Sequence, residues 1–316
     1  MLGLVPSFIP FTVGGGPPPS VIVVAVSNTG VGNRAMTSPD GITWTSRTSA
    51  ADNSWKVCYS STLGLFAAVS ASGTNNRVMT SPDGVTWTSR TSAADNNWQS
   101  ICWADTPGLF VAVGSSGTGN RVMTSPDGIT WTTRASVADV GWLCVGWSHD
   151  LGILVAGSST GDIMTSPDGV TWTSRTSGVA LSLNDVCYSP ALGLFVIVGS
   201  SGTVLTSPNG TTWTRRTAAS SIGWSGIAWS ADLSLFVAVA LNGTGNRVMT
   251  SPDGVTWTLH ASADDTAGWR KVCYSHGLGL FIAVGAAVVM TSPDGVTWTS
   301  RTGASANTWL SVACSG

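Results

Sequence analysis

Among the short segments of this chain that place asparagine directly before arginine, three lie in loops that read Ser/Asn-Gly-Thr-x-Asn-Arg. They are Asn76-Arg77, Asn120-Arg121 and Asn246-Arg247. Aspartates recur in other polar segments, among them Asp52, Asp95 and Asp139, and six tryptophans each begin an apolar run: Trp55, Trp98, Trp142, Trp224, Trp269 and Trp309. Arginine and amide groups supply paired hydrogen bonds, and an indole supplies a flat apolar face. Together they favour a polyhydroxylated ligand such as a glycan.

A structural interpretation of the same residues stays open. Each arginine can bridge to the aspartate of a neighbouring loop, and each tryptophan can pack in the core. The distance from the tryptophan to the next small residue is three positions at Trp55 but four at Trp98. A single strand alternation cannot accommodate both spacings, so we expect the tryptophans at the loop edge rather than deep in the fold.

The segments that position these residues repeat along the chain. Ser38 to Trp44 reads Ser-Pro-Asp-Gly-Ile-Thr-Trp, and close copies begin at Ser81, Ser125, Ser166, Ser207, Ser251 and Ser292, 41 to 44 residues apart. This period matches four short strands with their turns, which is one blade of a propeller. No segment shows a helical period. The sequence therefore predicts an all-β fold, a seven-bladed β-propeller of four-stranded blades over residues 21–316.

The chemistry of the heptad is that of a tight turn. Proline fixes one backbone angle, the aspartate accepts hydrogen bonds from backbone N–H groups further along, and glycine adopts a positive φ. The position of the acceptor is filled by Asp40, Asp83, Asp127, Asp168, Asn209, Asp253 and Asp294. Asn209 lacks the charge but keeps the acceptor, which a structural role tolerates. We expect all seven to be structural.

The heptad resembles the Asp-box, or BNR repeat, of sialidase-type propellers, sortilin-type domains and photosystem assembly factors. In that family the pattern is Ser/Thr-x-Asp-x-Gly-x-Thr-Trp, whereas here Gly41 follows Asp40 directly. The resemblance covers residues 21–316 and implies a propeller whose Asp-boxes form turns on the face away from the ligand site. It implies no single activity, because the fold carries unrelated functions.

Strands can be assigned within the repeat as A (55–60), B (65–70), C (77–81) and D (86–91). The chain enters at a B strand (21–27) and ends with a lone A strand (309–315), so we expect the last strand to complete the first blade. This 1+3 closure leaves no open sheet edge. The A–B and C–D turns, with the Asp-boxes, form one face, called here the turn face. The B–C and D–A loops, with the Asn-Arg pairs, form the opposite loop face.

The residue inventory argues against an enzyme. A sialidase of this fold would need an arginine cluster, a tyrosine nucleophile with an acidic partner and an aspartic acid. The tyrosines Tyr59, Tyr188 and Tyr274 share one strand position, which indicates core, and the chain has no glutamate. His149, His260 and His276 stand beside no evident nucleophile. We expect no catalytic residue, no cofactor and no metal site.

Composition limits the partners further. Only 9% of residues are charged and the net charge is −2, which favours neither nucleic acid nor an anionic membrane. Of the six cysteines, Cys58, Cys102, Cys187 and Cys273 occupy equivalent positions, too far apart on neighbouring blades for disulfides. Cys144 and Cys314 fall outside that register. We expect free, buried thiols and folding in a reducing compartment.

Residues 1–20 belong to no repeat. They contain an apolar run followed by Gly-Gly-Gly-Pro-Pro-Pro, without a basic segment, which argues against a secretory signal or membrane span. This segment is either a tail that is disordered or packs on the propeller, or an arm that docks into a partner.

These features predict a non-enzymatic interaction module. Closely similar repeats, a hydroxyl-rich surface and an apolar arm suggest a bacteriophage virion protein of the capsid or tail, docked to other virion proteins by residues 1–20 and presenting its loop face to host-surface glycan. A protein-binding assembly or scaffold factor, which predicts a charged patch, and a secreted lectin, which would be extracellular, are the alternatives.

Overall fold

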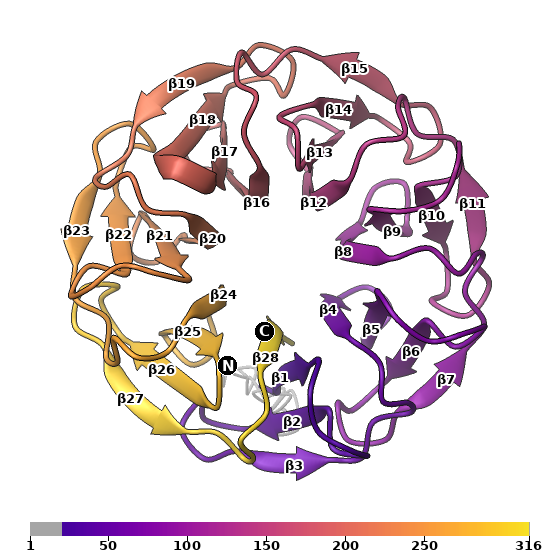
Figure 1. The fold of residues 1–316 in the computed structure, drawn as a ribbon, viewed down its shortest axis with the longest axis horizontal. Coiled ribbons are helices and arrows are strands. Elements are labelled where there is room, and N and C mark those ends of the chain that lie inside the picture. Colours follow the sequence, from indigo (N-terminus) through magenta and orange to yellow (C-terminus); the bar gives the residue numbers. More distant parts are fainter. Residues whose placement is uncertain (1–20, 316) are drawn as a thin grey trace, which may run out of the picture.

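The computed structural model describes residues 21–315, and these form a closed ring of seven antiparallel sheets of four strands each (Figure 1). The predicted all-β, seven-bladed propeller is therefore confirmed. The segment 1–20, for which a linker or docking arm is expected, and Gly316 lie outside the described residues.

The first four blades follow the predicted A-to-D order from the axis outward. Blade 1 contains β28 (Trp309–Cys314), β1 (Val23–Ser27), β2 (Ala35–Ser38) and β3 (Thr45–Arg47). Blade 2 contains β4 (Trp55–Ser60), β5 (Leu65–Ser70), β6 (Val78–Ser81) and β7 (Thr88–Arg90). Blade 3 contains β8 (Trp98–Ala104), β9 (Leu109–Gly114), β10 (Val122–Ser125) and β11 (Thr132–Arg134). Blade 4 contains β12 (Trp142–Ser148), β13 (Ile153–Ser158), β14 (Ile163–Ser166) and β15 (Thr173–Arg175).

The remaining blades repeat the pattern. Blade 5 contains β16 (Leu183–Ser189), β17 (Leu194–Gly199), β18 (Thr203–Ser207) and β19 (Thr214–Thr217), with a 3-10 turn at Ser200–Gly202. Blade 6 contains β20 (Trp224–Ser230), β21 (Leu235–Ala240), β22 (Val248–Ser251) and β23 (Thr258–His260). Blade 7 contains β24 (Trp269–Ser275), β25 (Leu280–Gly285), β26 (Val288–Ser292) and β27 (Thr299–Thr302).

Ring closure joins the two ends of the described chain in one sheet. Strand β28 pairs antiparallel with β1, with Val24 opposite Ala313 and Ala25 opposite Val312. The predicted 1+3 closure is therefore confirmed. Closure has a physical cause, because β1 would otherwise leave its backbone groups unpaired at the centre of the ring.

The core lies between the blades rather than inside any one of them. Strands B and C are buried along nearly their whole length, because both faces of these strands contact a neighbouring sheet. Each interface between adjacent blades forms its own apolar cluster; the cluster between blades 1 and 2, for example, contains Val24, Trp55 and Met79. A single blade cannot bury these surfaces alone, so stability requires the complete ring.

Candidate functional site

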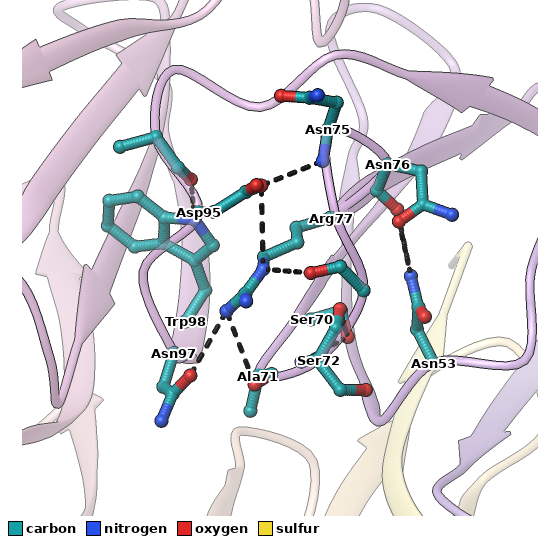
Figure 2. Close-up of polar contacts among 12 residues, drawn as sticks. Asn53, Ser70, Ala71, Ser72, Asn75, Asn76, Arg77, Asp95, Asn97 and Trp98 are labelled. Carbon is teal, nitrogen blue, oxygen red and sulfur yellow. Dashed lines mark hydrogen bonds and ion pairs between the residues drawn. The ribbon is translucent and has the colours of Figure 1, made fainter.

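The Asn-Arg segments of the loop face bind to the molecule's own backbone. In blade 2, Arg77 donates from Nε to the Gly73 carbonyl at 2.8 Å and from Nη1 to the Asn97 side chain at 3.0 Å. Its Nε lies 3.6 Å from Asp95 Oδ1, which also accepts the Asn75 N–H at 2.8 Å (Figure 2). Arg77 therefore connects its own loop to the loop that enters the next blade.

The same arrangement recurs in neighbouring blades. Arg121 lies 3.4 Å from Asp139, and Arg34, which the sequence analysis did not single out, lies 3.7 Å from Asp52. In blade 6, Arg247 Nη1 donates to the Ala267 carbonyl. The arginine side chains of the three ion pairs are only 13–16% exposed. The structure thus places these arginines in the bridges between loops, which was the structural interpretation.

The asparagines make a second set of bridges. Asn53 Nδ2 donates to the Asn76 carbonyl at 2.9 Å (Figure 2), and Asn96 donates to the Asn120 carbonyl at 2.8 Å. Buried amides of this kind fix loop conformation because each lost bond leaves a desolvated polar group. Asn246, by contrast, keeps a buried Oδ1 without a partner among the described residues. The loop face is therefore built mainly from internal contacts.

The six tryptophans do not lie at the loop edge, and that expectation is wrong. Trp55, Trp98, Trp142, Trp224, Trp269 and Trp309 are all 0% exposed. A β-bulge explains the irregular spacing: in β8 the register shifts between Trp98 and Ser100, whereas β4 pairs without a shift from Trp55 onward. The extra residue returns each indole to the same interface between blades. A buried indole offers no face to an outside ligand.

The Asp-box aspartates lie in the C–D turns, as the sequence predicts. Asp127 Oδ1 accepts the backbone N–H groups of Ile129 at 2.8 Å and Thr130 at 2.7 Å and the Ser125 hydroxyl at 3.0 Å. Asn209 accepts the equivalent three bonds at 2.9, 2.9 and 3.2 Å. Because the side chain acts only as an acceptor, the amide can replace the carboxylate. These turns have a structural role in every blade.

The turn face carries a feature that the sequence analysis did not recognise, a ring of exposed aliphatic side chains. Ten of the thirteen large exposed apolar side chains among the described residues lie there, each 38–48% exposed. We call them the aliphatic ring: Leu63, Leu151, Leu192 and Leu233 in A–B turns, and Ile42, Val85, Ile129, Val170, Val255 and Val296 in C–D turns. The signal was present in the sequence as the residue after the Asp-box glycine.

Half-buried aromatic rings surround the axis at the same face. The next-to-last strand A position holds Tyr59, Trp103, Trp147, Tyr188, Trp229 and Tyr274. In blade 1 the equivalent residue by strand pairing is Cys314, the last residue of β28. A cavity of about 450 Å³ lies among Tyr59, Trp229, Tyr274 and Cys314. At its rim Asp232 accepts the Tyr274 hydroxyl and a His276 ring nitrogen, both at 2.8 Å. Tyr274, which was expected in the core, therefore reaches the surface by its hydroxyl.

His149 and His276 each contact an aspartate. The exposed His149 bonds to Asp105 through Nδ1 at 3.1 Å, and this hydrogen bond raises the pKa of the imidazole. The Thr106 hydroxyl lies 3.4 Å from the same ring nitrogen, and residues 21–315 contain no group of three metal-ligating side chains. None of their helices is long and apolar enough to cross a bilayer. All six cysteines are free thiols, and Cys273 Sγ lies 3.0 Å from Cys314 Sγ.

Solved structures with the same fold have very different functions. The chain resembles YCF48 bound to D1 peptide, with 17% identity over 78% of this chain and 80% of that chain and a TM-score of 0.58. It also resembles virginiamycin B lyase from Staphylococcus aureus, with 10% identity, coverage of 79% and 84% and a TM-score of 0.68. A chain of the mitotic checkpoint complex matches at 13% identity, coverage of 99% and 90% and a TM-score of 0.64.

No protein-family model matches the chain, and no curated protein matches its sequence. At these identities the similarity establishes the seven-bladed propeller alone, and the Asp-box family stays a prediction. Two of the similar structures, the peptide-bound YCF48 and the checkpoint complex, are assemblies with other chains. The fold therefore occurs both in proteins that bind other chains and in a lyase, and it does not by itself decide between binding and catalysis.

Proposed function

We propose that this protein is a non-enzymatic interaction module that docks on a protein partner through its turn face. The observation that supports it is the aliphatic ring, which gathers most of the large exposed apolar side chains on one face. Exposed apolar side chains that gather on one face are typical of interaction sites in soluble proteins.

The turns do not need these aliphatic residues. The position after the Asp-box glycine is Thr211 in blade 5, and that turn makes the same hydrogen bonds as the others. A threonine therefore satisfies the turn geometry, yet the other six blades have isoleucine or valine there. An exposed aliphatic side chain gains little from folding, so the six copies favour a role in binding.

The partner that we propose is a bacteriophage virion, to which the protein would contribute a capsid or tail subunit. Support comes from the closely similar blades, the low content of charged residues and the apolar sequence of residues 1–20. These residues join the described chain at Val21, and Ile22 N–H donates to the Ser315 hydroxyl at 2.8 Å near the turn face. The arm and the aliphatic ring would then engage the same partner.

Substitution of the aliphatic ring tests this proposal. Val85, Ile129, Val170 and Val255 are changed together to threonine, the residue that blade 5 already has, and binding to virions that lack the protein is measured by co-sedimentation. The control changes Val31, Val137 and Leu241, exposed on the loop face, to threonine. We expect at least a tenfold loss of binding for the turn-face variant and none for the control. Equal binding of both variants, with melting temperatures unchanged, contradicts the proposal.

Glycan binding is a second candidate function. One observation favours a site on the turn face instead of the loop face. The tryptophans of the loop face are buried, whereas the half-exposed rings of Tyr59, Trp229 and Tyr274 surround a cavity that also has a carboxylate, Asp232. Aromatic faces beside hydrogen-bond acceptors suit a sugar ring. A glycan array with wild type and Trp229→Ala tests it: a hit that the variant loses supports this site, and a hit that the variant keeps points to the loops.

A further inference from the structure

Each strand A begins with a buried tryptophan, or with Leu183 in blade 5. The residue that follows it lies on the inner wall of the propeller, so each of the seven blades contributes one such residue. Strands β4, β8, β12, β16, β20, β24 and β28 surround the axis (Figure 1). Five of the seven positions are polar: Lys56, Gln99, Asn184, Ser225 and Arg270. They line a cavity of about 70 Å³ on the axis, toward the loop face.

This cavity brings together three of the fourteen Lys and Arg side chains of the chain. The chain contains only two lysines, Lys56 and Lys271, and both line it together with Arg270. Asp185 is the one carboxylate among the lining residues. A protein with a net charge of −2 thus places three cations and one anion at its centre.

Asp185 is already paired. Lys271 Nζ lies 2.6 Å and 2.7 Å from the two carboxylate oxygens, and the Ile227 N–H donates to Oδ2 at 2.8 Å. The Asp185 side chain is only 5% exposed, and its single negative charge offsets one of the three cations. This ion pair leaves the charges of Lys56 and Arg270 without a counterion.

The contacts of these two cations are few. Lys56 Nζ reaches the Leu310 carbonyl at 3.4 Å, a long hydrogen bond. Arg270 forms no ion pair among the described residues, and its Nε is buried without a hydrogen-bond partner. A buried guanidinium donor without a partner is costly, because it gives up hydration and gains nothing in return.

We propose that the axial cavity binds one small oxyanion, a phosphate, sulfate or carboxylate group, between Lys56 and Arg270. The class of ligand follows from the donors, since an ammonium and a guanidinium that face one cavity match the oxygens of such a group. The cavity has room for such a group, because a single water needs only about 10–15 Å³ of a volume measured in this way. The anion is either a free ion or a single acidic group that reaches in from the loop face.

Titration of the surrounding groups supports the same site. Burial, followed by repulsion from Lys271 and Arg270, lowers the pKa of Lys56 to about 8. Asp185 raises the pKa of Lys271 against the effect of burial, and burial raises the pKa of the nearby thiols of Cys102, Cys144 and Cys187 to about 12. Lys56 is therefore the group that loses its proton near pH 8, and anion binding should weaken as the pH rises through that value.

Binding is tested by calorimetry and thermal melting of the full chain at pH 6.5, with sodium phosphate, sulfate or acetate against chloride at constant ionic strength. We expect a saturable rise in melting temperature and a measurable binding isotherm with at least one oxyanion. Lys56→Met and Arg270→Met should each weaken binding at least tenfold. Arg90→Met, which removes an outer-strand arginine that bonds to Thr80, should leave it unchanged. An unchanged isotherm in the Lys56→Met/Arg270→Met double variant overturns the site.

Selective labelling keeps the test independent of variant stability. Because the chain has two lysines, a sample labelled at lysine Cε gives two side-chain resonances, and phosphate should shift one of them with the same dissociation constant as calorimetry. An acidic peptide added in place of the free ion distinguishes the two sources of the ligand. If neither resonance moves with phosphate, sulfate, acetate or the peptide, the cavity holds water only and the proposal fails.

Discussion

Removal of β28 tests the closure of the ring directly. A chain that ends at Thr308 loses the strand that pairs with β1 and keeps every other strand of the propeller. The loss also affects both neighbouring blades: Val57 N–H donates to the Ser311 hydroxyl at 3.3 Å, and Cys314 touches Cys273. We expect the truncated chain to lose the cooperative transition of the ring.

The magnitude follows from burial. Trp309 is 0% exposed and Leu310 is 7% exposed. Truncation of a buried tryptophan costs about 3–5 kcal/mol and of a buried leucine about 2–5 kcal/mol, so these two side chains alone account for about 5–10 kcal/mol. That is comparable with the whole net stability of a typical domain, about 5–15 kcal/mol. The shortened protein should therefore be unfolded, or associated through its exposed β1 edge, at 25 °C.

The assay uses circular dichroism melting, with a chain that ends at Ser315 as the matched control because it keeps all of β28. A synthetic peptide of residues 305–315 should restore the transition by pairing with β1, and the same peptide with Trp309→Ala should restore it far less. The reasoning fails if the truncated chain melts at the wild-type temperature, or if both peptides rescue it equally.

Four further predictions concern single groups. Asp127→Ala should lower the free energy of unfolding in urea by about 1–2 kcal/mol, because three hydrogen bonds are lost, whereas Asp127→Asn should cost under about 0.5 kcal/mol, as the natural Asn209 indicates. The hydrogen bond from the Thr43 N–H is the largest cause that lowers the pKa of Asp40. The stability that the Asp40 carboxylate contributes is therefore present above the unfolded pKa of ~3.9 and is lost as the pH falls through the lower folded value. Asp40→Asn should remove this contribution and flatten the acid melting profile. The stability of wild type relative to Lys56→Met should rise between pH 8 and 10.5, because only the unfolded chain keeps the Lys56 proton there; the buried thiols affect both proteins alike and cancel in this difference. Oxidation by diamide should join Cys273 to Cys314, detected as a mobility shift on a non-reducing gel that Cys314→Ser lacks, and should stabilise the ring by about 2–4 kcal/mol.

The architecture could be predicted because the same turn sequence occurs seven times at a nearly constant spacing. Each Ser-Pro-Asp-Gly turn is a local structure whose hydrogen bonds stay within four residues, such as those from Asp127 to Ile129 and Thr130. Local bonds of this kind depend on adjacent residues only, so the sequence contains all the information. The order of strands at the two ends then determined the closure by β28.

The tryptophans show where such reasoning ends. Their spacing was read as evidence for the loop edge, but a bulge at Trp98 and its absence at Trp55 bring both side chains to full burial. A bulge depends on how the partner strand pairs, which no local pattern reveals. The loop arginines were easier, because Arg77 and Asp95 recur together in other blades, and a repeated ion pair can be recognised as structural.

At the axis the seven blades have different residues at equivalent positions, whereas at the turn face they have similar ones. The two regions therefore indicate function in different ways. Positions that face the axis converge on one cavity, so seven identical charged side chains there would repel one another strongly. Variety at those positions is therefore required by geometry and is not itself a sign of function. Geometry does not require an excess of positive charge. Lys56 and Arg270 produce such an excess, because the one carboxylate that lines the cavity pairs with Lys271. The C–D turns of the turn face join the two outer strands of each blade, and uncharged side chains there do not repel one another, so identical residues are tolerated. There the repetition of one aliphatic residue, against the single Thr211, is the informative departure.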